Sequence, residues 1–81
     1  MTVVTLYGKP GCHLCDDARA EVARVREERG FELHEVDVSA EPALHRTHGE
    51  RIPVVAIDGV EVLELGVGAD ELRRLLDRVR S

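Results

Sequence analysis

Apolar residues recur along this chain with two different periods, and the two periods predict alternating strands and helices. Residues 3–7 are rich in valine, threonine and tyrosine, which favours a strand, and glycine and proline follow them. Gly30 tolerates the left-handed conformation that is common after a helix end, so it is predicted to end the helix of residues 12–29. That helix has apolar side chains at steps of three and four, which places one face in the core: Leu14, Ala18, Val22 and Val25.

The middle of the chain predicts a second strand and then a short helix. Apolar side chains in residues 31–38 favour the strand, although their alternation slips partway along it. Residues 41–48 are predicted to form the helix, with the side chain of Ser39 as its cap. Pro42 falls in the first turn, where a missing N–H costs little, and Gly49 ends the helix.

The last third of the chain predicts a hairpin and a closing helix. Pro53 interrupts the chain before the apolar run of residues 54–57, which is typical of a buried strand. Asp58 and Gly59 favour a two-residue type I′ turn, so residues 60–65 are expected to return as the partner strand. Two glycines bracket the loop that follows. The helix predicted after that loop carries an apolar stripe of Leu72, Leu75, Leu76 and Val79.

The predicted order of elements is β-α-β-α-β-β-α, which places the chain in the α/β class. The first strand, helix and second strand make a parallel pair with the usual right-handed connection. The hairpin adds an antiparallel pair. We therefore expect a four-stranded mixed sheet with helices on both faces, forming a single domain over residues 1–81.

Composition narrows the possible functions. A net charge of −5 argues against a nucleic-acid-binding domain, which normally carries a basic patch. No apolar run approaches the roughly 20 residues of a membrane helix, so no membrane association is expected. The first residues form a strand-like segment without the basic lead of a signal peptide, which makes a cytoplasmic location the expectation. Most arginines lie among acidic residues, as in an ion-paired surface.

The two cysteines, Cys12 and Cys15, require a chemical explanation. A small domain held together by disulfides usually has more cysteines, placed far apart in sequence. Here the pair lies between a strand and a helix, so Cys12 falls at the predicted helix N-terminus. Unpaired backbone N–H groups and the helix dipole stabilise a thiolate at such a position. The alternatives for a Cys-x-x-Cys pair are half of a metal site or two buried thiols.

This placement predicts thiol–disulfide exchange with divided roles. Cys12 attacks a substrate disulfide and forms a mixed disulfide. Cys15 lies one turn deeper and is expected to be less exposed; it attacks Cys12 and releases the reduced product. Lys9, and His13 when it is protonated, can add positive charge near Cys12, but both could instead be solvated side chains.

The chain resembles glutaredoxins, within the thioredoxin-fold superfamily, over nearly its whole length. It is similar to short bacterial glutaredoxin-like proteins with a Gly-Cys-His-Leu-Cys-Asp motif. The resemblance is carried by Leu6-Tyr7, Lys9, Cys12-x-x-Cys15, Val36-Asp37-Val38 and Arg51-Ile52-Pro53-Val54. It implies the thioredoxin/glutaredoxin fold, with a cis peptide bond at Pro53 facing the nucleophilic cysteine. The backbone of Ile52 would then pair with the main chain of a substrate.

The resemblance also implies a co-substrate, glutathione or another low-molecular-weight thiol. For the leading function we expect no bound cofactor or metal, whereas the carrier alternative that the resemblance suggests is an iron–sulfur cluster shared between two chains with Cys12 as a ligand. Two positions depart from the pattern. His13-Leu14 replaces the Pro-Tyr pair that is common in dithiol glutaredoxins, and Tyr often helps to hold glutathione. Before the last helix the chain has Gly66-Val67-Gly68-Ala69-Asp70. Asp70 either matches the family's glutathione-binding Asp or serves only as a helix-start residue.

The sequence leaves three functions open. The leading expectation is a monomeric oxidoreductase that reduces protein or small-thiol disulfides and is itself reduced by a small thiol or an upstream reductase. The second is a metal or iron–sulfur carrier that uses Cys12 and Cys15. His45 and His48 could supply further ligands, although an exposed helix face is the expected place for both. The third is a redox-inactive adaptor that uses the thioredoxin fold only for docking.

Overall fold

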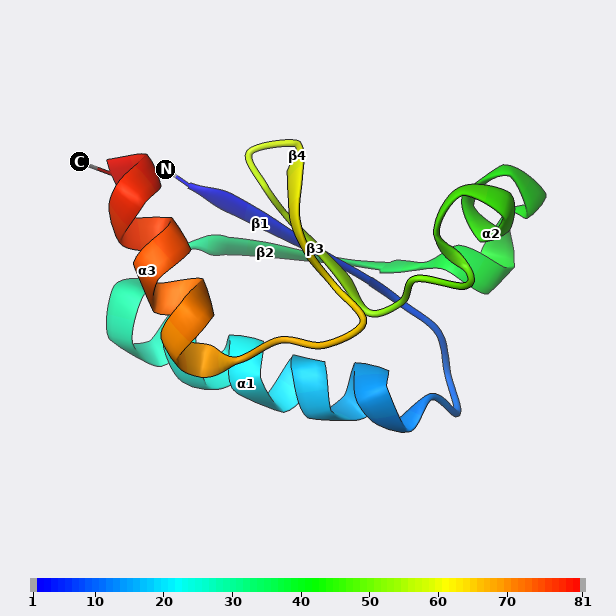
Figure 1. Cartoon of the computed structure of the whole chain (residues 1–81), viewed down its shortest axis with the longest axis horizontal. Helices are drawn as coiled ribbons and strands as arrows, with labels where there is room; N and C mark the ends of the chain where they lie inside the picture. Colours follow the sequence, from blue (N-terminus) through cyan, green and yellow to red (C-terminus); the bar gives the residue numbers. More distant parts are fainter. Residues whose placement is uncertain (1, 81) are drawn as a thin grey trace.

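A computed structural model describes residues 2–80 of the chain, with Arg80 described by its backbone alone. Its elements follow the predicted order, with a short 3₁₀ turn added after the second strand. They are β1 (Val3–Gly8), α1 (His13–Arg29), β2 (Glu32–Asp37), η1 (Val38–Ala40), α2 (Pro42–His48), β3 (Val54–Ile57), β4 (Val60–Glu64) and α3 (Ala69–Arg80) (Figure 1).

The four strands form one mixed sheet, as predicted, and their order in the sheet is β2-β1-β3-β4. β1 is parallel to β2 and antiparallel to β3, and β3 is antiparallel to β4. In the parallel pair Gly8 is opposite Asp37, so both strands end at the same edge of the sheet. The loop from β1 to α1, residues 9–12, leaves from this end of the sheet and is called the cysteine loop because it ends at Cys12; Cys15 follows in the first turn of α1.

The main core lies between one face of the sheet and the helices α1 and α3, which Figure 1 draws together on that side. The prediction that Leu14 belongs to the buried stripe of α1 is wrong, because its side chain is 51% exposed. Leu14 lies in the first turn of the helix, and Cys15 takes the buried position there. The buried residues of α1 are Cys15, Ala18, Val22 and Val25.

The opposite face of the sheet is covered by α2 at one end. Leu6 points into the main core, and the alternation of β1 directs Tyr7 to the other face. There the ring of Tyr7 stacks on His48 of α2. Helices therefore lie on both faces, as predicted, but α2 has only seven residues and reaches only the end of the sheet near the cysteine loop (Figure 1).

The hairpin turn has the predicted conformation. Asp58 and Gly59 both have positive φ, 51° and 87°. The carboxylate of Asp58 also accepts a hydrogen bond of 2.9 Å from the backbone N–H of Val3, which ties the turn to the start of β1. The partner strand ends at Glu64 rather than at residue 65, because Leu65 has a φ of 64° and leaves the extended conformation.

The predicted cap of α2 is wrong, and one residue of the apolar stripe of α3 is exposed. Ser39 does not cap α2: it lies in η1, where the carboxylate of Asp37 accepts bonds from its backbone N–H and its hydroxyl. These bonds also lower the pKa of the Asp37 carboxyl. The N-cap of α2 is Glu41, whose side chain makes no capping bond. Val79 does not join the buried stripe of α3, because it lies near the end of the helix and is 48% exposed.

Candidate active site

Cys12 occupies the N-cap of α1, which begins at His13. Its backbone is extended, and its sulfur accepts a hydrogen bond of 3.2 Å from the backbone N–H of Cys15. Its carbonyl accepts the first helical bond, 3.0 Å long, from the N–H of Asp16. The prediction that Cys12 lies at the start of the helix is confirmed. The sulfur therefore uses one of the amide groups that a helix N-terminus leaves unpaired.

Cys15 lies under Cys12 and is almost fully buried, with 1% of its surface exposed, whereas Cys12 is partly exposed. Burial is the main cause that raises the pKa of the Cys15 thiol, and the hydrogen bond to Cys12 raises it further. The backbone N–H of Lys9 and the positive charge of Arg19 lower it. The two thiols thus differ in exposure as the sequence predicts, and the buried one is held in its neutral form.

The segment before β3 completes the surroundings of the cysteines. Ile52 packs in one buried cluster with Cys15 and Val38, and Cys12 and Tyr7 lie at the border of this cluster. The peptide bond between Ile52 and Pro53 is cis, as the family resemblance implies. The loop before β3 is therefore brought to the cysteine pair, although it follows Cys15 by more than thirty residues.

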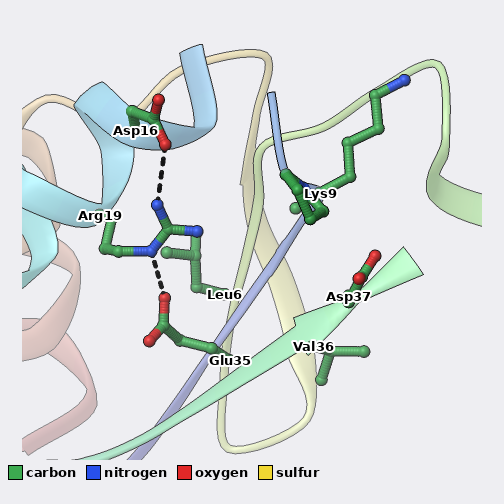
Figure 2. A pocket seen from close by; sticks show the side chains of 9 residues that line it. Leu6, Lys9, Asp16, Arg19, Glu35, Val36 and Asp37 are labelled. Carbon is green, nitrogen blue, oxygen red and sulfur yellow. Dashed lines mark hydrogen bonds and ion pairs between the residues drawn. The ribbon is translucent and has the colours of Figure 1, made fainter. Parts of the chain in front are cut away.

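Lys9 and His13 lie on either side of Cys12 in the sequence. Among the described residues, Lys9 makes no ion pair, and Figure 2 shows its side chain extending away from Arg19. His13 is the first residue of α1 and is exposed. Lys9 lies in the cysteine loop and is partly exposed, and His13 directly follows Cys12.

Asp70 is not brought to the cysteines. It lies in the first turn of α3, and its carboxylate pairs with Arg73 at 2.5 Å. The same guanidinium binds Glu28 at 2.6 Å. Glu28 is sixteen positions after Cys12, and a helix rises about 1.5 Å per residue, so the two ends of this stretch lie about 24 Å apart. The arrangement favours the helix-start role for Asp70.

His48 was expected on an exposed helix face, and this expectation is wrong. Its exposed fraction is 6%, its ring stacks on Tyr7, and its Nε2 lies 2.7 Å from a carboxylate oxygen of Glu61. Its Nδ1 is buried and, within residues 2–80, has no hydrogen-bond partner. The helical spacing contained the signal: Leu44, one turn earlier, packs on the cysteine cluster, so His48 shares the inward face. His45 is exposed, as expected.

A pocket of about 450 Å³ lies behind the cysteine loop, at the edge where β1 and β2 end. Arg19 is its central charged group: its guanidinium bonds to Glu35 at 2.5 Å and to Asp16 at 2.9 Å (Figure 2). The sequence indicates only that arginines lie among acidic residues, and nothing local in it pairs Arg19 with Glu35. The residues that line the pocket are Leu6, Gly8, Lys9, Pro10, Asp16, Arg19, Glu35, Val36 and Asp37.

Between residues 2 and 80, no group of three or more histidine, cysteine and acidic side chains is arranged to hold a metal ion. Over the same part of the chain, no helix has the length and apolar character needed to cross a membrane.

The sequence matches a family model. Residues 3–77 match the glutaredoxin-like domain DUF836. The uncharacterized protein Rv0508 of Mycobacterium tuberculosis is 34% identical to this chain over an aligned length of 83. The alignment covers 96% of this chain and 84% of that protein.

Solved structures are similar to this chain in fold. The X-ray structure of the structural genomics target XcR50 from X. campestris superposes with a TM-score of 0.80 at 34% identity, over 93% of this chain and 96% of that one. Thioredoxin-2, a component of malaria parasite protein secretion machinery, superposes with a TM-score of 0.75 at 16% identity, over 96% of this chain and 82% of that one. The second likeness shows the thioredoxin fold alone. The chain therefore belongs to the glutaredoxin-like DUF836 family, built on a thioredoxin fold with two neighbouring cysteines at the start of its first helix.

Proposed function

We propose that this protein is a thiol–disulfide oxidoreductase in which Cys12 is the nucleophile and Cys15 the resolving thiol. The observation that carries the proposal is the hydrogen bond from the Cys15 N–H to the sulfur of Cys12 at the N-cap of α1. A thiolate accepts such a bond more strongly than a thiol does, and the helix dipole adds to the effect. Cys12 is also the more exposed sulfur, so a substrate can reach it.

The reaction has two steps. The Cys12 thiolate attacks one sulfur of a substrate disulfide; a mixed disulfide forms and the other substrate sulfur leaves as a thiolate. Cys15 then loses its proton to water and attacks Cys12, which forms the internal disulfide and releases the second substrate sulfur. The two cysteines lose two electrons and the substrate disulfide gains them. Glutathione, another small thiol or an upstream reductase returns the protein to the dithiol state.

Disulfides of proteins and mixed disulfides of small thiols are the proposed substrates. Support comes from the surroundings of Cys12: Lys9 and His13 can carry positive charge at the rim, and Ile52 lies beside the cysteine pair. A peptide that crosses this rim can bond to the backbone of Ile52 as a short added strand. For glutathione we propose contacts with Lys9 and with the Ile52-Pro53 segment.

Mass spectrometry after incubation with glutathione disulfide tests the proposal. The wild-type protein should lose the mass of two hydrogens, the signature of an internal Cys12–Cys15 bridge, and the Cys15→Ser variant should retain one glutathione on Cys12. The Cys12→Ser variant should gain no stable adduct at neutral pH, because Cys15 is buried. Adduct formation on Cys15 at the wild-type rate would contradict the assigned roles.

Turnover is tested with a mixed disulfide of glutathione as substrate. We expect Cys12→Ser to abolish turnover, and the matched change Leu14→Ser, at the exposed position between the two cysteines, to preserve the internal bridge. If the wild-type protein forms neither the Cys12–Cys15 disulfide nor a glutathione adduct, the proposed oxidoreductase activity is wrong and the adaptor role is favoured.

A further inference from the structure

In the resolving step, the buried thiol of Cys15 must lose its proton before its sulfur can attack Cys12. Only the thiolate of Cys15 can attack Cys12, and burial together with Cys12 raises the pKa of the Cys15 thiol. The Cys15 sulfur is in contact with Gly8, because a Cβ built on Gly8 would lie 3.1 Å from it. Gly8 also lines the pocket behind the cysteine loop. The buried sulfur thus lies directly behind one wall of a water-accessible pocket.

Arg19 places a positive charge at this pocket. It follows Cys15 by four residues on α1, so the two side chains share one face of the helix, with Cβ atoms about 5–6 Å apart. Glu35 and Asp16 hold the guanidinium through bonds to Nε and Nη1 (Figure 2). Ion pairs between half-exposed side chains contribute little to stability, and Arg19 and Glu35 are 46% and 48% exposed. The ion pairs of Arg19 with Asp16 and Glu35 therefore contribute little to the free energy of folding. Stability does not explain why they lie beside Cys15.

We propose that Arg19 is a positioning residue for the resolving step: its guanidinium, held at the pocket by Glu35 and Asp16, favours the anionic form of Cys15 while that sulfur attacks Cys12. The proposal rests on the proposed function, which supplies the step. In that step the Cys15–H bond breaks and its proton goes to water in the pocket. The Cys15–Cys12 bond forms, and the bond between Cys12 and the substrate sulfur breaks with its electron pair on the substrate.

Several ionisable groups surround Cys15, and the sign of each charge decides whether that group favours or opposes the Cys15 thiolate. Arg19 is the cation whose charge lowers the pKa of the Cys15 thiol, whereas a negative Cys12 raises it. Removing Arg19 leaves the two carboxylates that held it, and their charge opposes a thiolate. The groups come from α1, from β1 with its following loop, and from β2: Cys12, Asp16, Arg19, Tyr7, Lys9, Glu35 and Asp37.

A neutral disulfide, 2,2′-dithiodipyridine, separates the two steps in the reduced full-length protein. Attack by Cys12 releases one pyridine-2-thione, and attack by Cys15 on the resulting mixed disulfide releases a second. We expect Arg19→Gln to leave the first phase unchanged and to slow the second about threefold at neutral pH. The smaller thiolate population slows the step, and the higher nucleophilicity of the more basic thiol offsets part of this loss. The pH profile of the second phase should move to higher pH.

Three further variants separate the effect of charge from that of structure. Arg19→Lys keeps the positive charge and should restore most of the second-phase rate. Glu35→Gln removes one of the two carboxylates but keeps Arg19, which Asp16 still binds, so the second phase should be slowed less than in Arg19→Gln. Arg24→Gln, on the same helix and paired with Glu21, is the matched control and should behave as the wild type.

The outcomes distinguish this inference from the proposed function. If wild-type protein releases no second thione, the proposed function fails. If the wild type shows both phases, the inference is overturned in either of two cases: Arg19→Gln leaves the rate and pH profile of the second phase unchanged, or Glu35→Gln slows it as much as Arg19→Gln does. The latter result would mean that the tie between α1 and β2 matters and the charge does not.

Discussion

The imidazole of His48 lies flat against the ring of Tyr7, with ring centroids 4.3 Å apart and planes 7° from parallel. Tyr7 also borders the cluster that contains Cys15. Through this stack the short helix α2 is packed against the end of β1, directly before the cysteine loop. A helix of seven residues is too short to be stable alone, so its contacts with the sheet must hold it in place.

Replacing His48 should therefore loosen α2. We expect His48→Ala to lower the free energy of unfolding by about 3 kcal/mol, because it removes a buried ring and its bond to the Glu61 carboxylate. Urea unfolding measures the change. His45→Ala, an exposed position on the same helix, is the control and should change the free energy of unfolding by less than about 0.5 kcal/mol. Equal effects of the two variants would contradict the packing role of His48.

Acid should weaken the contact between His48 and Glu61. His48 and Arg51 hold the pKa of the Glu61 carboxyl below its usual value of 4.5 through hydrogen bonds. A carboxyl whose pKa is depressed in the folded state contributes stability above its unfolded pKa, and that contribution is lost as the pH falls through the folded value. We therefore expect stability to decline as the pH falls below 4.5, and to decline less steeply in Glu61→Gln.

Urea unfolding midpoints measured between pH 3 and pH 6 would give the slope of stability against pH. Glu27→Gln on α1 is the charge-matched control, because among the described residues Glu27 forms no ion pair. A slope that Glu61→Gln leaves as steep as in the wild type would show that the bonds to Glu61 do not contribute to acid sensitivity.

Local patterns in the sequence predict most of the fold, because helices, strands and tight turns form between residues that are close together in the chain. The stripe of Ala18, Val22 and Val25 predicts α1, and Asp58-Gly59 predicts the hairpin that ties back to Val3. Cys12 could be placed at a helix start for the same reason.

Contacts between residues far apart in sequence could not be predicted in this way. The bond from His48 to Glu61 and the bond from Arg19 to Glu35 join elements that meet only after the sheet has formed. Leu14 is exposed because Cys15, three residues before Ala18, takes the buried position of the first turn, and helical spacing alone allows either residue there.

Gly8 offers a steric test of the site. A Cβ on Gly8 would lie 3.1 Å from the sulfur and 3.2 Å from the Cβ of Cys15, so one of the two residues must move. We expect Gly8→Ala to cost about 1–3 kcal/mol of stability, the usual range for overpacking, and to slow the formation of the internal disulfide. Urea unfolding and the rate of bridge formation measure the two effects. Gly66→Ala meets no atom within 4 Å and should change neither.

Asp70 provides the last test, because the resemblance and the structure assign it different roles. Its carboxylate is 87% exposed and pairs with Arg73, which is bound to Glu28 far along α1 from Cys12. We therefore expect Asp70→Asn to change kcat and KM with a glutathione mixed disulfide by less than twofold. Asp77→Asn, on the same helix and paired with Arg29, is the control. A tenfold rise in KM that is specific to Asp70→Asn would mean that the carboxylate reaches bound glutathione after all, and that α3 must move toward the cysteines when glutathione binds.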